Sequence, residues 1–211
     1  AAAIRGDAIH PLTRGAIALP YDWDAFRQED CGVIAADATR SFLLRQVPRF
    51  GAKLFHGRKV EAPIMSTTLT IDSAKRSFDA VIVAAGSWAA KLLPEFAGRL
   101  TAKRRVVGWF KTDEPRALPV LCIDNDAGVF GMPTPRGHYK LGLHAVGETT
   151  DPDNVREADD DDAALLSKYV AQILPQHDPE PVRLSRCLYT VTPDENFLIT
   201  PSAADERVLL F

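Results

Sequence analysis

The sequence has 211 residues, of which 46% are hydrophobic and 25% are charged, and its formal net charge at neutral pH is −3. This is the balance of an ordinary globular protein that can bury a substantial core. It lacks the basic character of a nucleic-acid binder, and no apolar run approaches the roughly 20 residues that a membrane-spanning helix needs.

The first part of the chain predicts short elements. Residues 1–31 mix polar and apolar residues with turn-forming proline and glycine, which indicates short strands and loops. Asp37 is the expected N-cap of a helix that ends near Gly51. We expect a strand over 53–56, and then a hairpin whose first strand covers 66–71 and whose turn follows directly.

A short run over 78–85 is the clearest element. It is nearly all apolar and rich in β-branched residues, which is typical of a parallel strand buried on both faces. The run ends at Gly86, and a helical pattern follows over 89–93. A junction of strand, glycine and helix is the type of place where open α/β sheets bind ligands.

The second half predicts antiparallel strands with polar turns, at 105–110, 118–123, 128–132, 139–146, 183–191 and 196–200. A helix between them begins at the acidic run 159–162 and ends at Pro175. Those acids suit the positive end of the helix dipole, and we favour this interpretation over a metal site. The residues 208–211 begin another apolar strand, in which the sequence stops. Together with the absence of a Gly-x-Gly-x-x-Gly fingerprint, this favours a truncated chain over a small domain with a C-terminal edge strand.

Three segments, at 81–88, 139–144 and 187–197, occur in an order and at separations that resemble the glycine oxidase and sarcosine oxidase family of FAD-dependent amine and amino-acid oxidases. Within that family the resemblance is to sarcosine oxidases and N-methyltryptophan oxidases, and it runs from about residue 32 to the last residue. It implies a mixed α/β fold, in which part of a Rossmann-like FAD-binding domain joins an antiparallel-sheet substrate domain.

The resemblance also implies a division of the chain and a reaction. We expect a substrate-domain or linker segment at 1–31, FAD-binding segments at 32–95 and 196–211, and the substrate-binding domain at 96–195. The family oxidises the secondary amine of an amino acid to an imine, and molecular oxygen becomes hydrogen peroxide. The implied cofactor is FAD, and the implied partner is a small amine, with no nucleic acid and no membrane.

Lys140 and His144 are the first catalytic candidates. Strand alternation places them on one face together with Gly142, and a glycine there leaves room for a flat ring or a substrate. The resemblance implies that Lys140 lies over the flavin, where an ammonium stabilises the superoxide formed from oxygen. It implies that His144 lies near the substrate. An edge-strand lysine and a structural histidine are the alternatives.

Cys187 and Tyr189 form a second group of candidates. The resemblance implies that Cys187 carries covalent FAD, because a thiolate can attack the flavin methyl group, and neighbouring Arg186 would favour the thiolate. Tyr189 matches a tyrosine that lines the substrate pocket, so we count it as catalytic. A small buried cysteine and a core aromatic residue are the alternatives. The three cysteines lie far apart without Cys-x-x-Cys spacing, and so predict a reducing, cytoplasmic location and no metal.

The remaining candidates bind the cofactor. The resemblance implies that backbone atoms at Val60 hold adenine, and that the dinucleotide passes close to Gly86, where a side chain would be in the way. Trp88 is expected near the flavin edge. One departure is Phe130, which stands where the sarcosine oxidases have a tyrosine, and this predicts a more apolar or larger substrate.

Other functions are kept open. One is an FAD-linked dehydrogenase or demethylase with another electron acceptor, against which Lys140 argues. A second is a non-catalytic fragment that binds no flavin, since the phosphate-binding loop is missing. A third is an interaction domain, which would need an exposed apolar patch.

Overall fold

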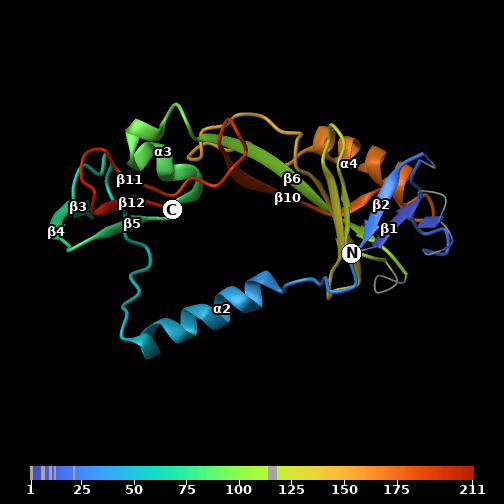
Figure 1. The fold of residues 1–211 in the computed structure, drawn as a ribbon, viewed down its shortest axis with the longest axis horizontal. Helices are drawn as coiled ribbons and strands as arrows, with labels where there is room; N and C mark the ends of the chain where they lie inside the picture. Colours follow the sequence, from blue (N-terminus) through green and yellow to red (C-terminus); the bar gives the residue numbers. More distant parts are fainter. Residues whose placement is uncertain (1, 6–7, 10, 12, 21, 114–117) are drawn as a thin grey trace. The chain divides into compact units, whose positions relative to one another are not determined.

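The computed structural model describes residues 2–5, 8–9, 11, 13–20, 22–113 and 118–211 (Figure 1). The fold is mixed α/β with an antiparallel sheet, as expected. The chain divides into two compact units: unit 1 comprises Ala1–Ile34, Arg105–Glu148 and Arg156–Cys187, and unit 2 comprises Ala35–Arg104, Thr149–Val155 and Leu188–Phe211. The expected domain boundaries at 31, 95 and 195 stay a prediction. Among the described residues, no helix combines the length and the apolar character needed to cross a membrane.

Unit 1 is built on a five-stranded sheet with the order β10-β6-β9-β8-β7, which we call the large sheet. Its strands are β6 (Thr101–Lys111), β7 (Leu121–Ile123), β8 (Val129–Pro133), β9 (His138–Leu143) and β10 (Pro181–Val191). The pairs β6–β9, β8–β9 and β7–β8 are antiparallel, as the sequence predicts. Both β6 and β10 have one end in unit 2.

Helix α4 (Asp160–Ile173) packs on one face of the large sheet (Figure 1). Its apolar residues Leu166, Val170 and Ile173 are buried in one cluster with Phe110 and Tyr139. A capping box begins the helix, because the Asp159 side chain accepts from the backbone N–H of Asp162 while the Asp162 side chain accepts from that of Asp159. The predicted helix start is confirmed.

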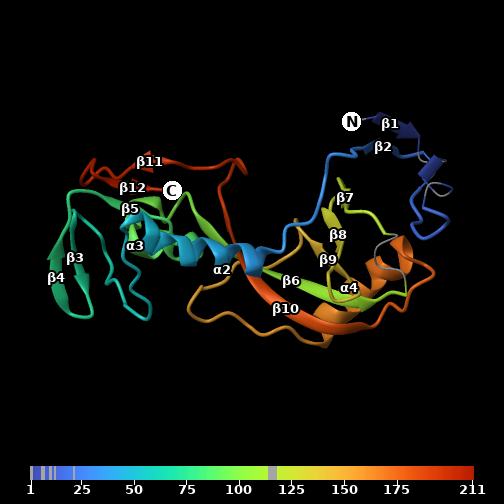
Figure 2. The same ribbon diagram turned by 90° about the horizontal axis from the view of Figure 1, so that it is seen from below.

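The N-terminal segment of unit 1 forms a hairpin of β1 (Ala2–Arg5) and β2 (Asp24–Arg27), which are antiparallel (Figure 2). The expected short strands and loops are therefore present in the described part of this segment. The rest of the prediction for 1–31 falls on residues 1, 6–7, 10, 12 and 21, which lie outside the described residues.

Unit 2 has a small sheet of β11 (Thr200–Pro201), β12 (Val208–Leu210) and β5 (Val81–Val83), a hairpin of β3 (Thr68–Ile71) and β4 (Ala74–Ser77), and the helices α2 (Ala36–Gln46) and α3 (Ala89–Leu92). Strands β5 and β12 are parallel, which confirms the expected parallel strand. The hairpin turns at Asp72 and Ser73, and both have positive φ angles, as in a tight two-residue turn. Gly51 ends the α2 region in a left-handed conformation, as predicted.

Some expected elements are wrong. The segment 53–56 is not a strand; only an isolated bridge between Val60 and Ile71 occurs near it. Of the expected strand 196–200, only Thr200 lies in one. Before it, Thr192 donates from its side chain to the carbonyl oxygen of Asn196 at 2.8 Å, a local bond that competes with strand pairing.

Two further corrections concern burial and capping. Strand β5 is buried on one face only, since the side chain of Val83 is 4% exposed while that of Ile82 is 68% exposed. Among the described residues, the buried core cluster of unit 2 includes Val83 but not Ile82, so it covers only the face of β5 that carries Val83. Asp37 lies inside the first turn of α2, and the N-cap is Ala35 without a side-chain hydrogen bond.

Candidate functional site

The large sheet has two faces of different character. Along β9, Tyr139, Leu141 and Leu143 are buried in the core under α4. Because successive side chains of a strand point to opposite faces, Lys140 and Gly142 lie on the other face. We call this second face the open face; its members in unit 1 include Arg105, Val107, Trp109, Cys122, Phe130, Met132, Lys140, Gly142 and His144.

Strand register arranges the open face in rows. Trp109 on β6 lies opposite Lys140 on β9, and Lys140 lies opposite Met132 on β8. The next row runs from Val107 through Gly142 and Phe130 to Cys122. Residues that are far apart in the sequence therefore become direct neighbours.

Lys140 is half-buried and lies against an aromatic ring. Its Nζ atom is 5.5 Å from the ring centroid of Trp109, and the Cζ atom of Arg183 is 4.4 Å from the same centroid. Among the described residues, neither Lys140 nor Arg183 forms an ion pair. The positive charge on this part of the face is thus not neutralised by a carboxylate.

His144 follows the end of β9 and stacks on Phe130. The two ring centroids are 4.2 Å apart with an interplanar angle of 27°. The backbone N–H of His144 donates to the carbonyl oxygen of Gly128, and Arg105 Nε donates to the carbonyl oxygen of His144 at 2.8 Å. Burial and then the positive charge of Arg105 lower the pKa of His144. Its imidazole is therefore neutral at neutral pH.

The space above Gly142 is occupied by a side chain of the protein itself. A Cβ atom placed on Gly142 would lie 2.6 Å from the Phe130 ring and 2.8 Å from Val107. Gly142 does leave room for a flat ring, as expected, but the Phe130 ring fills that room. The glycine is therefore no evidence of space for a ligand ring. The glycine lets Phe130 cross to the next strand and reach His144.

Cys187 lies on β10, half-buried, on the same face as Arg183. Between them Leu184 packs toward the core under α4, and Arg186 binds Glu157 with N–O distances of 2.8 and 2.7 Å. Strand alternation then directs Cys187 to the open face and Arg186 away from it. The guanidinium that was expected to favour the Cys187 thiolate is therefore engaged with a carboxylate.

The candidates Gly86, Trp88, Tyr189 and Val60 all belong to unit 2. Gly86 has a φ of 52° just after β5, and a Cβ atom there would have one neighbour, at 4.0 Å. Ser87 is 8% exposed and contacts the next segment: its hydroxyl donates to the carbonyl oxygen of Tyr189 at 3.3 Å and lies 3.1 Å from the Thr190 hydroxyl. The structure therefore brings the glycine turn and the segment after Cys187 together.

Trp88 and Val60 have partners within unit 2. The indole N–H of Trp88 donates to Asp153 at 2.7 Å, and Lys91 also binds Asp151 and Asp153. Val60 forms an isolated bridge with Ile71. Contacts of these residues with a dinucleotide stay predictions. The open approach to Gly86 at the carboxyl end of a parallel strand does fit a dinucleotide.

The acidic residues at the start of α4 include two that bind groups of the protein itself. Asp159 and Asp162 form the capping box, and Arg156 binds Asp159 and also Glu148. Within the part of the chain that the structure describes, no group of three or more His, Cys, Asp and Glu could hold a metal ion.

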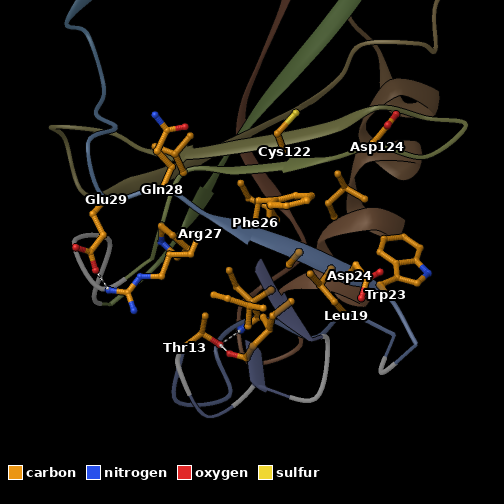
Figure 3. A pocket seen from close by; sticks show the side chains of 18 of the residues that line it. Thr13, Leu19, Trp23, Asp24, Phe26, Arg27, Gln28, Glu29, Cys122 and Asp124 are labelled. Atoms are coloured by element: carbon orange, nitrogen blue, oxygen red, sulfur yellow. Dashed lines mark hydrogen bonds and ion pairs between the residues drawn. The ribbon is translucent and has the colours of Figure 1, made fainter. Parts of the chain in front are cut away.

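A cavity of about 1130 Å³ lies in unit 1 between the N-terminal hairpin and β7 (Figure 3). Apolar side chains such as those of Leu19, Trp23 and Phe26 line it, together with the carboxylates of Asp24 and Asp124. Cys122 on β7 lines the cavity and pairs with Phe130 in the sheet, so the cavity adjoins the open face. The apolar residues among the expected loops of 1–31 are the one sign of this cavity in the sequence.

Sequence reasoning missed Trp109 and Arg183. Their signal was weak, because a tryptophan and an arginine in strands usually need no functional explanation. Only the register that places Trp109 opposite Lys140 makes them part of the candidate site.

The chain is similar to known proteins in sequence and in fold. Residues 4–211 match the family described as FAD dependent oxidoreductase. Monomeric sarcosine oxidase of Bacillus sp. (strain NS-129) is 28% identical over 198 residues, which are 87% of this chain and 51% of the relative. N-methyl-L-tryptophan oxidase of Salmonella dublin is 25% identical over 219 residues, which are 98% of this chain and 58% of the relative.

A solved structure has the same fold. The open form of an unusual amino acid oxidase essential for nikkomycin biosynthesis superimposes with a TM-score of 0.76 at 21% identity, and covers 99% of this chain and 59% of that chain. The chain thus spans about half the length of the curated relatives that it matches.

Proposed function

Since this chain belongs to the family of FAD-dependent oxidoreductases, we propose that the protein oxidises a secondary amine, such as an N-methyl amino acid, to an imine. The amine loses two electrons and two protons, and molecular oxygen takes up both and becomes hydrogen peroxide. Water then hydrolyses the imine. Bound FAD supplies the two-electron acceptor between the amine and oxygen.

The open face carries this proposal. Lys140, His144 and Cys187 are separated by up to 47 positions in the sequence, yet strand alternation and register give all three to one face of the large sheet. Lys140 brings an ammonium without a carboxylate partner in the described residues. Such a cation stabilises negative charge that develops on oxygen.

His144 has a separate role in the proposal. Amine oxidation requires the neutral amine, because a protonated nitrogen has no lone pair. The lowered pKa of His144 keeps its ring neutral at neutral pH, so it adds no positive charge that would compete with the amine for a hydrogen-bond acceptor. The Phe130 ring holds this imidazole by stacking, and its lack of a hydroxyl favours a more apolar or larger substrate than sarcosine.

Four residues would hold the FAD. Gly86 leaves an open approach for the dinucleotide, and Val60 and Trp88 flank it in the proposed arrangement. We assign covalent attachment to Cys187. Forming the C–S bond removes the thiol proton, one methyl hydrogen and two electrons, and oxygen accepts these to give hydrogen peroxide.

The test is a visible absorption spectrum of the complete protein before and after acid precipitation. Flavin absorbance that stays with the pellet in wild type and moves to the supernatant in Cys187→Ala is the expected result. Flavin that stays with the pellet of Cys187→Ala contradicts the attachment point alone. A folded protein without any flavin contradicts the proposed enzyme.

Peroxide production separates the oxidase from an FAD-linked dehydrogenase. With a secondary amine as substrate, we expect about one hydrogen peroxide for each amine oxidised. Turnover that needs an added electron acceptor and yields no peroxide would favour the dehydrogenase instead.

A further inference from the structure

The indole ring of Trp109 is shared by two cations. Trp109 and Lys140 are register partners in the pair β6–β9, with Nζ 5.5 Å from the ring centroid. The Arg183 guanidinium on β10 is closer, with Cζ at 4.4 Å. A cation within about 6 Å of an indole centroid is attracted by the negative face of the ring. Both side chains therefore have the same neutral partner.

Two arginines of unit 1 bind carboxylates instead. Arg156 binds Glu148 and Asp159, and Arg186 binds Glu157. In the described chain neither Lys140 nor Arg183 has such a carboxylate. An aromatic partner holds a cation in place and leaves its charge uncompensated, whereas a carboxylate would cancel it.

We propose that Trp109 is the positioning residue of Lys140, because its indole ring holds the lysine ammonium in place on the open face. A lysine side chain is long and flexible, and fixing it costs rotamer entropy. Contact with the indole fixes the ammonium before an anion arrives. The catalytic consequence of this inference rests on the proposed function, in which the anion is the reduced oxygen species.

The experiment combines anion binding with oxygen kinetics in the complete holoprotein. The affinity of the oxidised protein for nitrate is measured by titration calorimetry at low ionic strength, and the rate of reoxidation by oxygen is measured after reduction by substrate. The variants are Trp109→Leu, Trp109→Phe, Lys140→Met and the double variant Trp109→Leu/Lys140→Met.

Trp109→Leu is expected to weaken nitrate binding and to slow reoxidation by a similar factor, roughly three- to thirtyfold, the range that corresponds to a cation–π contact. Trp109→Phe keeps a ring and is expected to recover most of both losses. In the double variant Trp109→Leu is expected to add little to Lys140→Met, because it acts through that lysine.

The outcomes separate this inference from the proposed function. If Lys140→Met weakens nitrate binding but Trp109→Leu does not, Trp109 does not position Lys140. Losses that add fully in the double variant contradict the inference in the same way. If Lys140→Met leaves reoxidation unchanged, the proposed role of Lys140 toward oxygen is wrong, and the nitrate data alone decide whether Trp109 positions Lys140.

Discussion

The two faces of the large sheet share one backbone but have opposite surroundings. On the face under α4, Phe110, Tyr139 and Leu141 are fully buried. On the open face, their strand neighbours Trp109 and Lys140 are only half-buried and contact each other. Alternation along a strand thus separates residues that stabilise the fold from residues available for chemistry, so that adjacent residues can be tested for one property without the other.

The largest expected effect comes from Leu141, next to Lys140 on β9. Leu141→Ala removes a fully buried side chain and should lower the free energy of unfolding by about 2–5 kcal/mol. Lys140→Met, its matched control, should change that free energy by less than about 1 kcal/mol, because it exchanges side chains of similar volume at a half-buried position. Denaturant unfolding of both variants measures this.

The same pair should behave in the reverse way in kinetics. Lys140→Met should slow flavin reoxidation by about a hundredfold, on the scale of losing one electrostatic stabiliser, and leave reduction by substrate nearly unchanged. Equal slowing of both half-reactions would contradict the role of Lys140. A stability loss as large as that of Leu141→Ala would contradict the separation of the two faces.

Two glycines, one on β8 and one on β9, test how tightly each face is packed. A Cβ atom on Gly131 would lie 2.4 Å from the Tyr139 ring on the buried face, and one on Gly142 would lie 2.6 Å from the Phe130 ring on the open face. Tyr139 is fully buried, and its hydroxyl donates to the carbonyl oxygen of Pro119 at 3.0 Å, so it has little freedom to move.

Gly131→Ala should therefore cost about 1–3 kcal/mol of stability, as overpacking of a core does. A Cβ atom on Gly142 would also lie 2.8 Å from Val107, but its nearest neighbour, Phe130, is half-buried and can turn away. Gly142→Ala should therefore cost less than Gly131→Ala, and it should disturb the stacking on His144. Thermal and denaturant unfolding give the costs. An equal loss in both variants would show that the open face is as tightly packed as the buried one.

Much of the buried face could be predicted from sequence. Alternating Tyr139, Leu141 and Leu143 predict one buried face, and the helical spacing of Leu166, Val170 and Ile173 predicts the helix that covers it. These patterns are local and repeat over several residues, so they survive in the fold. The family and its FAD dependence were also readable, from short segments in a fixed order.

The open face could be predicted only in part. That Lys140 and Gly142 share a face follows from alternation, but the Trp109 ring beside Lys140 follows from register between strands about 30 residues apart, which a single sequence does not reveal. The Phe130 ring over Gly142 has the same origin. Likewise, the exposure of Ile82 could not be foreseen, because an apolar run does not say which of its faces is covered.

A smaller effect is expected at the start of the helix that covers the buried face. Asp159→Ala removes the capping box of α4 and should cost about 1 kcal/mol of stability. Asp161→Ala, in the same first turn but outside the box, is the control and should cost only a few tenths of a kcal/mol. If both variants lose the same unfolding free energy, the stabilisation comes from the negative charge of the first turn and not from the capping box.

The smallest expected effect is a pH dependence of stability, which only the open face should show near neutral pH. Burial raises the pKa of Tyr139, so the buried face does not titrate near neutral pH. On the open face, burial and Arg105 lower the pKa of His144. As the pH falls below about 6.5, the ordinary value for histidine, the unfolded chain takes up a proton at this residue before the folded protein does.

Stability therefore decreases as the pH falls from about 6.5 to the lowered pKa of His144, and the part due to this residue is absent in His144→Gln. The chain has five histidines, so the difference in unfolding free energy between wild type and His144→Gln isolates the contribution. That difference should shift in favour of the variant on acidification. A difference in unfolding free energy that does not depend on pH would contradict the burial of His144 and its position near the positive charge of Arg105 in the folded protein.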